Sequence, residues 1–148
     1  MAGTIPIILL LQHDEVDPGC YLEEYLRCAD QSTWGSAQQG GGTGSQDTRP
    51  RVHVVTLKLW TADDKPRLPT GVSDTVPFVV SAEDEGPSTG RVVGIVSCGG
   101  DLSANDTDQN PYFTDVMALF RSAIEAKVPV LAICLGAQLL ARSLGGTV

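Results

Sequence analysis

The residue best placed for chemistry is Cys134, which stands between a run of aliphatic residues and a stretch with helical spacing. This order of strand, nucleophile and helix is typical of a nucleophile elbow, whose reactive side chain occupies a strained turn. The positions two before and two after it must be small, and they are Ala132 and Gly136. The elbow would place the sulfur at the positive end of a helix, where a thiolate is favoured, and would aim the backbone N–H of Leu135 at a developing oxyanion.

A second loop suited to a site follows the aliphatic run Val92–Val96, which ends directly in Ser97, Cys98, Gly99 and Gly100. In α/β folds, a strand that runs into paired glycines commonly forms part of a site. We expect Cys98 to pack within the strand, and we expect Cys20 and Cys28 to be structural or incidental.

Together these motifs resemble the class I glutamine amidotransferases, in particular the small stand-alone members similar to the glutaminase part of GMP synthase. The elbow sequence Cys134-Leu135-Gly136-Ala137-Gln138 is the most specific match. The segment from Gly99 to Asp106 resembles the oxyanion loop of that family, which usually reads Gly-Gly-Pro. Weaker similarities are Leu144-Gly145-Gly146 after the elbow helix and, near the start, Leu10-Leu11-Gln12-His13 followed by Leu22-Glu23-Glu24-Tyr25-Leu26.

The resemblance implies a glutaminase in which Cys134 attacks the side-chain amide of glutamine, releases ammonia and forms a γ-glutamyl thioester that water hydrolyses. It implies that Gly100 and Leu135 form the oxyanion hole and that Gly99 and Gln138 bind the substrate. No cofactor and no metal are implied. The implied partners are glutamine or another γ-glutamyl compound and an ammonia-accepting synthase domain or chain.

Three other functions stay open at this point. The first is a γ-glutamyl peptidase of the same family, which would use the same thioester. The second is a non-catalytic binding module that keeps the elbow without a triad base. The third is the group of intracellular peptidases and chaperone-like proteins that also use a cysteine elbow, although Gln138 and the glycine pair at 145–146 favour the glutaminases.

The sequence departs from the family pattern in two places. Asp101 replaces the usual proline of the oxyanion loop, so we expect a looser loop with a carboxylate near the site. The family supplies its base and orienting carboxylate as His-x-Glu after the elbow, but none of the fourteen residues after Cys134 is His, Asp or Glu. We therefore expect a fragment of a longer protein, or else a shortened inactive relative, with little glutaminase activity by itself.

The two histidines precede the elbow and do not match the catalytic histidine of the family. His13 follows the first predicted strand, at the edge where α/β sites form, and is the candidate for a substitute base. His53 is expected to lie on a strand and to be hydrogen-bonded there.

Short aliphatic runs alternate with amphipathic stretches, and this order predicts a three-layer α/β sandwich with a mostly parallel sheet. The flavodoxin-like form of this fold is what the resemblance implies.

We predict one partial domain over residues 1–148, with a disordered insertion at 31–50 and an irregular region at 61–90 that contains at most one edge strand at Phe78–Val80. The predicted strands are Ile5–Leu11, Arg51–Trp60, Val92–Val96 and Val128–Ile133. The first predicted helix is a short one around Leu22–Leu26, and the last covers Gly136–Leu144. Between them we predict a helix with Asn110 as its N-cap and Pro111 in its first turn, on which one face is formed by Val116, Leu119, Phe120, Ala123 and Ile124.

Composition narrows the classes of partner. The chain has 148 residues and a net charge of −8, which repels phosphate backbones and anionic lipid heads. Nucleic acid and membrane surfaces are therefore poor partners. We see neither a signal peptide nor a transmembrane run, so we expect a cytoplasmic protein with reduced cysteines.

Overall fold

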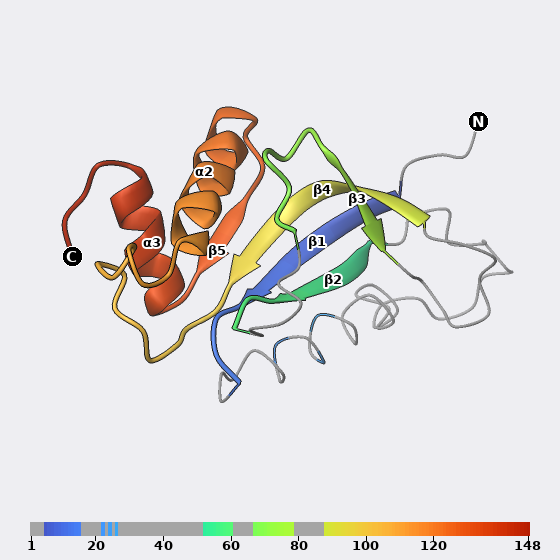
Figure 1. Ribbon diagram of the computed structural model, residues 1–148. Helices are drawn as coiled ribbons and strands as arrows, with labels where there is room; N and C mark the ends of the chain where they lie inside the picture. The colour runs from blue at the N-terminus through green and yellow to red at the C-terminus, as the bar shows by residue number, and fades with distance from the viewer. Residues whose placement is uncertain are drawn as a thin grey trace, which may run out of the picture.

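The computed structural model describes residues 5–15, 52–60, 67–78 and 88–148, together with Leu22, Glu24 and Leu26. The predicted insertion at 31–50, Cys20, Cys28 and most of the predicted first helix lie outside these residues. The elements in chain order are β1 (Ile5–Gln12), β2 (His53–Lys58), β3 (Thr75–Phe78), β4 (Ser88–Ser97), α2 (Tyr112–Glu125), β5 (Val130–Ala132) and α3 (Leu135–Ser143) (Figure 1).

The five strands form one sheet in the order β2-β1-β4-β3, with β5 paired to β4. The strands β1, β2, β4 and β5 run parallel, whereas β3 is antiparallel to β4. β1 lies between β2 and β4, and this position explains its unbroken aliphatic sequence, because a central parallel strand is buried on both faces. Ile7, Leu9, Leu10 and Leu11 are all fully buried. The predicted α/β class with a mostly parallel sheet is confirmed.

Side chains from helical residues cover both faces of this sheet. On one face, α2 and α3 lie side by side (Figure 1) and enclose the main core, in which Phe113, Leu119 and Phe120 have no exposed surface. On the other face, the backbone at Leu22 and Leu26 is helical, and their side chains pack against a smaller cluster of Leu10, Val54, Val96 and Cys98. The described residues therefore form the three predicted layers.

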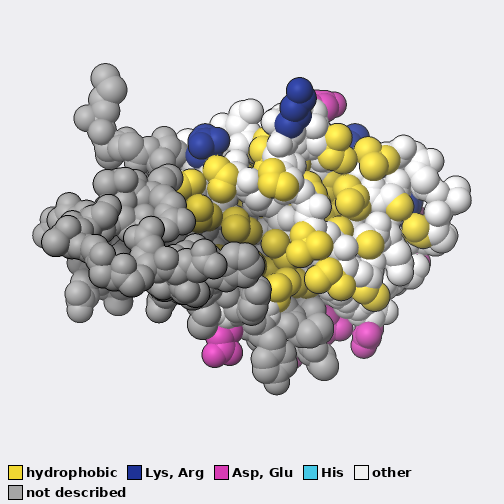
Figure 2. Space-filling view, turned by 180° about the vertical axis from the view of Figure 1, so that it is seen from behind, with side chains coloured by type: hydrophobic (Ala, Val, Ile, Leu, Met, Phe, Trp, Pro, Cys, Tyr) yellow, Lys and Arg dark blue, Asp and Glu magenta, His cyan; other side chains and the backbone are white. Residues whose placement is uncertain are grey.

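Some large apolar side chains remain at the surface. Leu131 is 54% exposed and Leu144 is 62% exposed. Figure 2 shows apolar side chains gathered over much of the described part of one face. No helix in the described ranges is long and apolar enough to cross a membrane.

The edge strand differs from its predicted position. β3 spans Thr75–Phe78 and so includes the first residue of the predicted strand at Phe78–Val80, whose other two residues lie outside the described ranges; β4 begins at Ser88 rather than Val92. The two differences have one cause, since antiparallel pairing of Pro77 with Thr89 and of Phe78 with Ser88 extends both strands. Among the described strands β3 lies at the edge of the sheet, and edge strands are where proline is tolerated.

The start and the buried face of α2 also differ from prediction. Pro111 occupies the N-cap position, no side chain caps the helix, and the Asn110 amide instead donates to the Asp106 carbonyl oxygen at 3.2 Å. Val116, Leu119, Phe120 and Ala123 are buried as predicted. Ile124, which was predicted on the same face, is 42% exposed in the last turn of the helix.

This contrast predicts the stability of two variants on the same helix. Phe120→Ala empties a fully buried site and should lower the free energy of unfolding by about 3–5 kcal/mol. Ile124→Ala removes a side chain that is 42% exposed and should lower it by about 1 kcal/mol. Urea unfolding followed by circular dichroism measures both. Equal losses in the two variants would show that the core is not where the structure places it.

Candidate functional site

Cys134 lies at the junction of β5 and α3, in the strained turn that the elbow pattern predicts. Its backbone angles are φ 49° and ψ −113°, in the left-handed half of conformational space that side chains other than glycine rarely adopt. α3 begins at the next residue, Leu135, and the Cys134 side chain is exposed. The fold therefore presents a thiol at the amino end of a helix, at the carboxyl edge of a parallel sheet.

Gly136 allows this turn to approach the end of β4. Its N–H donates to the carbonyl oxygens of Ile133 (2.9 Å) and Cys98 (3.1 Å). A Cβ added at this position would lie 2.6 Å from the Ser97 hydroxyl oxygen and 2.7 Å from the Ser97 carbonyl oxygen. Both distances are closer than real Cβ contacts, so only glycine fits here without a backbone shift.

The glycine loop lies directly against the elbow. A Cβ added at Gly99 would be 3.2 Å from the Cβ of Cys134 and 3.9 Å from its Sγ. A Cβ added at Gly100 would lie 3.2 Å from both His13 Cβ and Leu135 Cδ2. Within the part of the chain that the structure describes, the N–H groups of Gly100 and Leu135 make no hydrogen bond. The structure thus brings Cys134, Gly99, Gly100 and Leu135 together.

Asp101 gives the glycine loop a contact with the segment after β1. Its N–H points to Asp14 Oδ2 at 3.4 Å, a contact that the usual proline could not make because it has no N–H. Asp101 is exposed. The replacement therefore links the glycine loop to the segment after β1, and the expected looser loop stays a prediction.

Gln138 lies in the first turn of α3, where its N–H donates to the Cys134 carbonyl oxygen at 3.0 Å. Its side chain is exposed at the same end of the helix as Cys134. The glycine pair ends the same helix: Gly145 has a φ of 85°, and the Gly146 N–H donates to the Ala141 carbonyl oxygen at 2.9 Å.

His13 is buried with only 1% of its surface exposed. Its Nε2 lies 2.9 Å from Ser97 Oγ, and its ring stacks on Tyr112 at 5.9 Å and meets the edge of Phe113 at 6.4 Å. Burial lowers the pKa of His13 from 6.5 to about 4, so the ring is neutral at pH 7. A group with this pKa is a weak acceptor for a thiol proton, which argues against the substitute base. His53 lies on β2 and is partly buried.

Sequence reasoning missed the partnership of His13 with Ser97, which are 84 positions apart. A signal was present, because both residues follow or end a predicted parallel strand, and the carboxyl ends of parallel strands meet at one edge of the sheet. It also missed Asp14, which follows His13 directly. Among the described residues, no group of three metal-binding side chains occurs.

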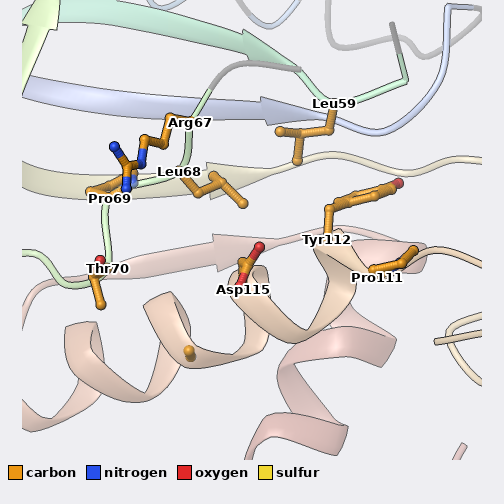
Figure 3. Close-up of a pocket in the computed structure, with 9 residues that line it drawn as sticks. Leu59, Arg67, Leu68, Pro69, Thr70, Pro111, Tyr112 and Asp115 are labelled. Atoms are coloured by element: carbon orange, nitrogen blue, oxygen red, sulfur yellow. The ribbon is translucent and has the colours of Figure 1, made fainter. Parts of the chain in front are cut away.

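Two cavities open beside this edge. The larger, of about 830 Å³, lies between the 67–70 segment and α2, with Leu59 and Tyr112 toward one end and Arg67 and Thr70 toward the other (Figure 3). The smaller, of about 300 Å³, shares Leu59 and Tyr112 with it and is otherwise lined by His13, Asp14, Trp60, Leu102 and Asn110. Because His13 and Asp14 contact Gly100, the smaller cavity adjoins the glycine loop.

Comparisons with known proteins find two partial matches to this chain. Residues 103–148, which include the elbow, match the family model described as Peptidase C26. The chain is also 34% identical to the carbamoyl phosphate synthase small chain of Brucella anthropi over 108 residues, which is 71% of this chain and 25% of that relative. The chain therefore spans about a quarter of the length of this relative. No solved structure matches.

Both similarities agree with the resemblance to class I glutamine amidotransferases that the elbow and glycine loop indicate. They do not single out the members that are similar to GMP synthase.

The strained elbow predicts an unusual effect of glycine. At a positive φ, glycine avoids the strain that alanine bears, so Cys134→Gly should exceed Cys134→Ala in free energy of unfolding by about 1 kcal/mol. Urea unfolding measures both. The matched control is Ala137→Gly in the first turn of α3. Here glycine replaces alanine at an ordinary helical position, so the free energy of unfolding should fall by about 0.5–1 kcal/mol. If Cys134→Gly were the less stable of the two elbow variants, the turn would not be strained as described.

The pKa of His13 predicts how stability depends on pH. Because burial lowers this pKa to about 4, the unfolded chain binds the proton more readily than the folded chain. The stabilisation is complete above about pH 6.5 and is lost as the pH falls toward 4, by about 3 kcal/mol in all. Urea unfolding between pH 7 and pH 4 measures it, with His13→Gln as the control that lacks the ionisable ring. If the free energy of unfolding of His13→Gln fell with decreasing pH as steeply as that of the wild type, the low pKa of His13 would be refuted.

Proposed function

We propose that this chain provides the nucleophile and the oxyanion hole of a glutamine amidotransferase-type glutaminase. The observation that supports this most directly is the junction of Cys134 with the glycine loop, where an exposed thiol in a strained turn lies against Gly99. The similarities to the Peptidase C26 family and to the small chain of a carbamoyl phosphate synthase support an activity of this type.

In the proposed reaction, Cys134 Sγ attacks the side-chain carbonyl carbon of glutamine. A C–S bond forms, the C–N bond then breaks, and ammonia leaves with the proton taken from the thiol. Water next attacks the γ-glutamyl thioester, and glutamate and the free thiol result. The backbone N–H groups of Gly100 and Leu135, which have no hydrogen-bond partner among the described residues, would donate to the tetrahedral oxyanion at each step.

Gln138 and Gly99 are the proposed substrate contacts. Gln138 is exposed one turn beyond the nucleophile, so its amide could meet the polar end of bound glutamine. Gly99 leaves room for substrate beside Sγ, because a side chain at this position would contact Cys134. His13 is a poor proton acceptor for the thiol, because its ring is buried and has a low pKa.

The finer assignment, a relative of the glutaminase part of GMP synthase, rests on the pattern of the elbow and the first strand. An ammonia-accepting synthase chain or domain is the proposed partner. The similarity to a protein named as the small chain of a synthase supports a partner of this class. We propose that the protein acts in the cytoplasm and needs no cofactor.

A γ-glutamyl peptidase is the second candidate, and the smaller cavity favours it. Ammonia needs no cavity of about 300 Å³, whereas an aminoacyl leaving group would occupy one. This cavity adjoins Gly100 through His13 and Asp14, so a substituent on the substrate amide could enter it.

Labelling of Cys134 tests the proposed function. A chloroketone analogue of glutamine should add one label to the protein, detected by intact mass, and Cys134→Ala should abolish it. Cys98→Ala is the matched control and should keep the label, since Cys98 is buried and Cys134 is exposed.

Protection experiments then identify the substrate class. Glutamine should slow the labelling and asparagine should not, because the shorter side chain does not reach the thiol. Stronger protection by a γ-glutamyl dipeptide than by glutamine would favour the peptidase. Labelling that neither compound slows would contradict both functions and favour a binding module.

A further inference from the structure

One buried polar contact near the elbow has no part in the reaction described above. His13 Nε2 and Ser97 Oγ lie 2.9 Å apart, with 1% of His13 exposed and none of Ser97. The contact joins the residue that follows β1 to the last residue of β4. Buried polar groups cost free energy unless they are paired, so each of these two side chains depends on the other.

Ser97 is in turn packed against the elbow on two sides. Its carbonyl oxygen accepts the N–H of Ile133 at 2.9 Å, immediately before Cys134. Its Oγ fills the space next to Gly136, where an added Cβ would be 2.6 Å away. The position of Ser97 Oγ therefore limits how closely the first turn of α3 can approach β4.

His13 also touches the other half of the oxyanion hole. Its Cβ lies against the open side of Gly100, where an added Cβ would be 3.2 Å away. The next residue, Asp14, accepts the N–H of Asp101 at 3.4 Å and holds the glycine loop from the same side. One side chain thus reaches the Gly100 loop directly and the Leu135 turn through Ser97.

We propose that His13 is a positioning residue for the oxyanion hole, and that its hydrogen bond to Ser97 sets the spacing between the N–H groups of Gly100 and Leu135. This inference rests on the proposed function, because it concerns the geometry of that same site. His13 touches neither substrate nor thiol in this role. It acts through Ser97 on the elbow and through its own Cβ on the loop.

The structure gives a reason for an imidazole here. The ring is held between Tyr112 and Phe113, so Nε2 has a fixed direction toward Ser97. The ring is also neutral, so it adds no charge beneath a site where negative charge develops. The other ring nitrogen, Nδ1, is buried without a hydrogen-bond partner among the described residues. Within the described part of the chain, the ring is therefore oriented by its hydrogen bond to Ser97.

Two amide variants separate the two ring nitrogens. In His13→Gln the side-chain amide reaches about as far as Nε2 and can keep the contact with Ser97. In His13→Asn the amide reaches only as far as Nδ1 and loses it. Ser97→Ala removes the same hydrogen bond from the other side and adds no atom to the core.

The experiment compares two reactions of Cys134 in these variants. An activated γ-glutamyl ester acylates the thiol through a tetrahedral oxyanion, and its leaving group needs no proton. Iodoacetamide alkylates the same thiol without forming an oxyanion. The mass of the intact protein follows both reactions, and thermal melting reports whether each variant is folded.

If His13 positions the oxyanion hole, the ester should acylate His13→Asn and Ser97→Ala about tenfold more slowly than wild type at saturating concentration. KM should change little, because the variants lose stabilisation of the oxyanion and not binding of the ester. Their alkylation by iodoacetamide should stay within about twofold of wild type. His13→Gln should keep most of the acylation rate. If His13→Asn does not fold, Ser97→Ala decides the result.

Two results would overturn the positioning role. One is wild-type acylation in Ser97→Ala, and the other is an equal fall of acylation and alkylation in the folded variants, which would mark a merely structural contact. A wild-type protein that the ester does not acylate would instead overturn the proposed function, and this inference with it.

Discussion

The close approach of α3 to the end of β4 is the constraint on which the rest of the site depends. Gly136 can donate to both Ile133 and Cys98 only because it has no side chain. The chain must then reverse direction within one residue, and Cys134 takes a φ of 49°. The same turn places the N–H of Leu135 beside the glycine loop. A single steric condition therefore produces both an exposed thiol and one half of a potential anion site.

The sheet supplies the rigid support that such a strained turn needs. β1 and β4 are central, and Leu9, Leu11 and Ile95 are almost completely buried along them. Their carboxyl ends are joined by the backbone hydrogen bond from Cys98 to Leu11 at 2.9 Å and by the side-chain contact of His13 with Ser97. Strain of the order of 1–3 kcal/mol persists where surrounding contacts determine the conformation. The elbow is bonded to these strand ends through the N–H groups of Ile133 and Gly136, which donate to Ser97 and Cys98.

Local patterns made much of the fold and the elbow predictable from sequence, and long-range contacts account for what was missed. The aliphatic run of β1, the helical spacing of α3 and the small residues around Cys134 each lie within a short window. The contact of His13 with Ser97 spans 84 positions, so no local pattern specifies it. The position of β3 depends on its pairing with β4, and the exposure of Ile124 depends on where the core ends. These three features are properties of packing.

The balance of charge around the glycine loop follows from the same geometry. A carboxylate at Asp101 opposes a developing oxyanion, but Asp101 is exposed, and two unit charges about 4 Å apart in bulk water interact by only about 1 kcal/mol. A misplaced oxyanion donor costs more, about 3 kcal/mol when the donor is lost completely. The N–H that Asp101 gains over proline holds the loop to Asp14, next to Gly100. Holding Gly100 in place preserves more stabilisation of the oxyanion than the screened repulsion from Asp101 removes. The loop can therefore tolerate an acidic residue at this position.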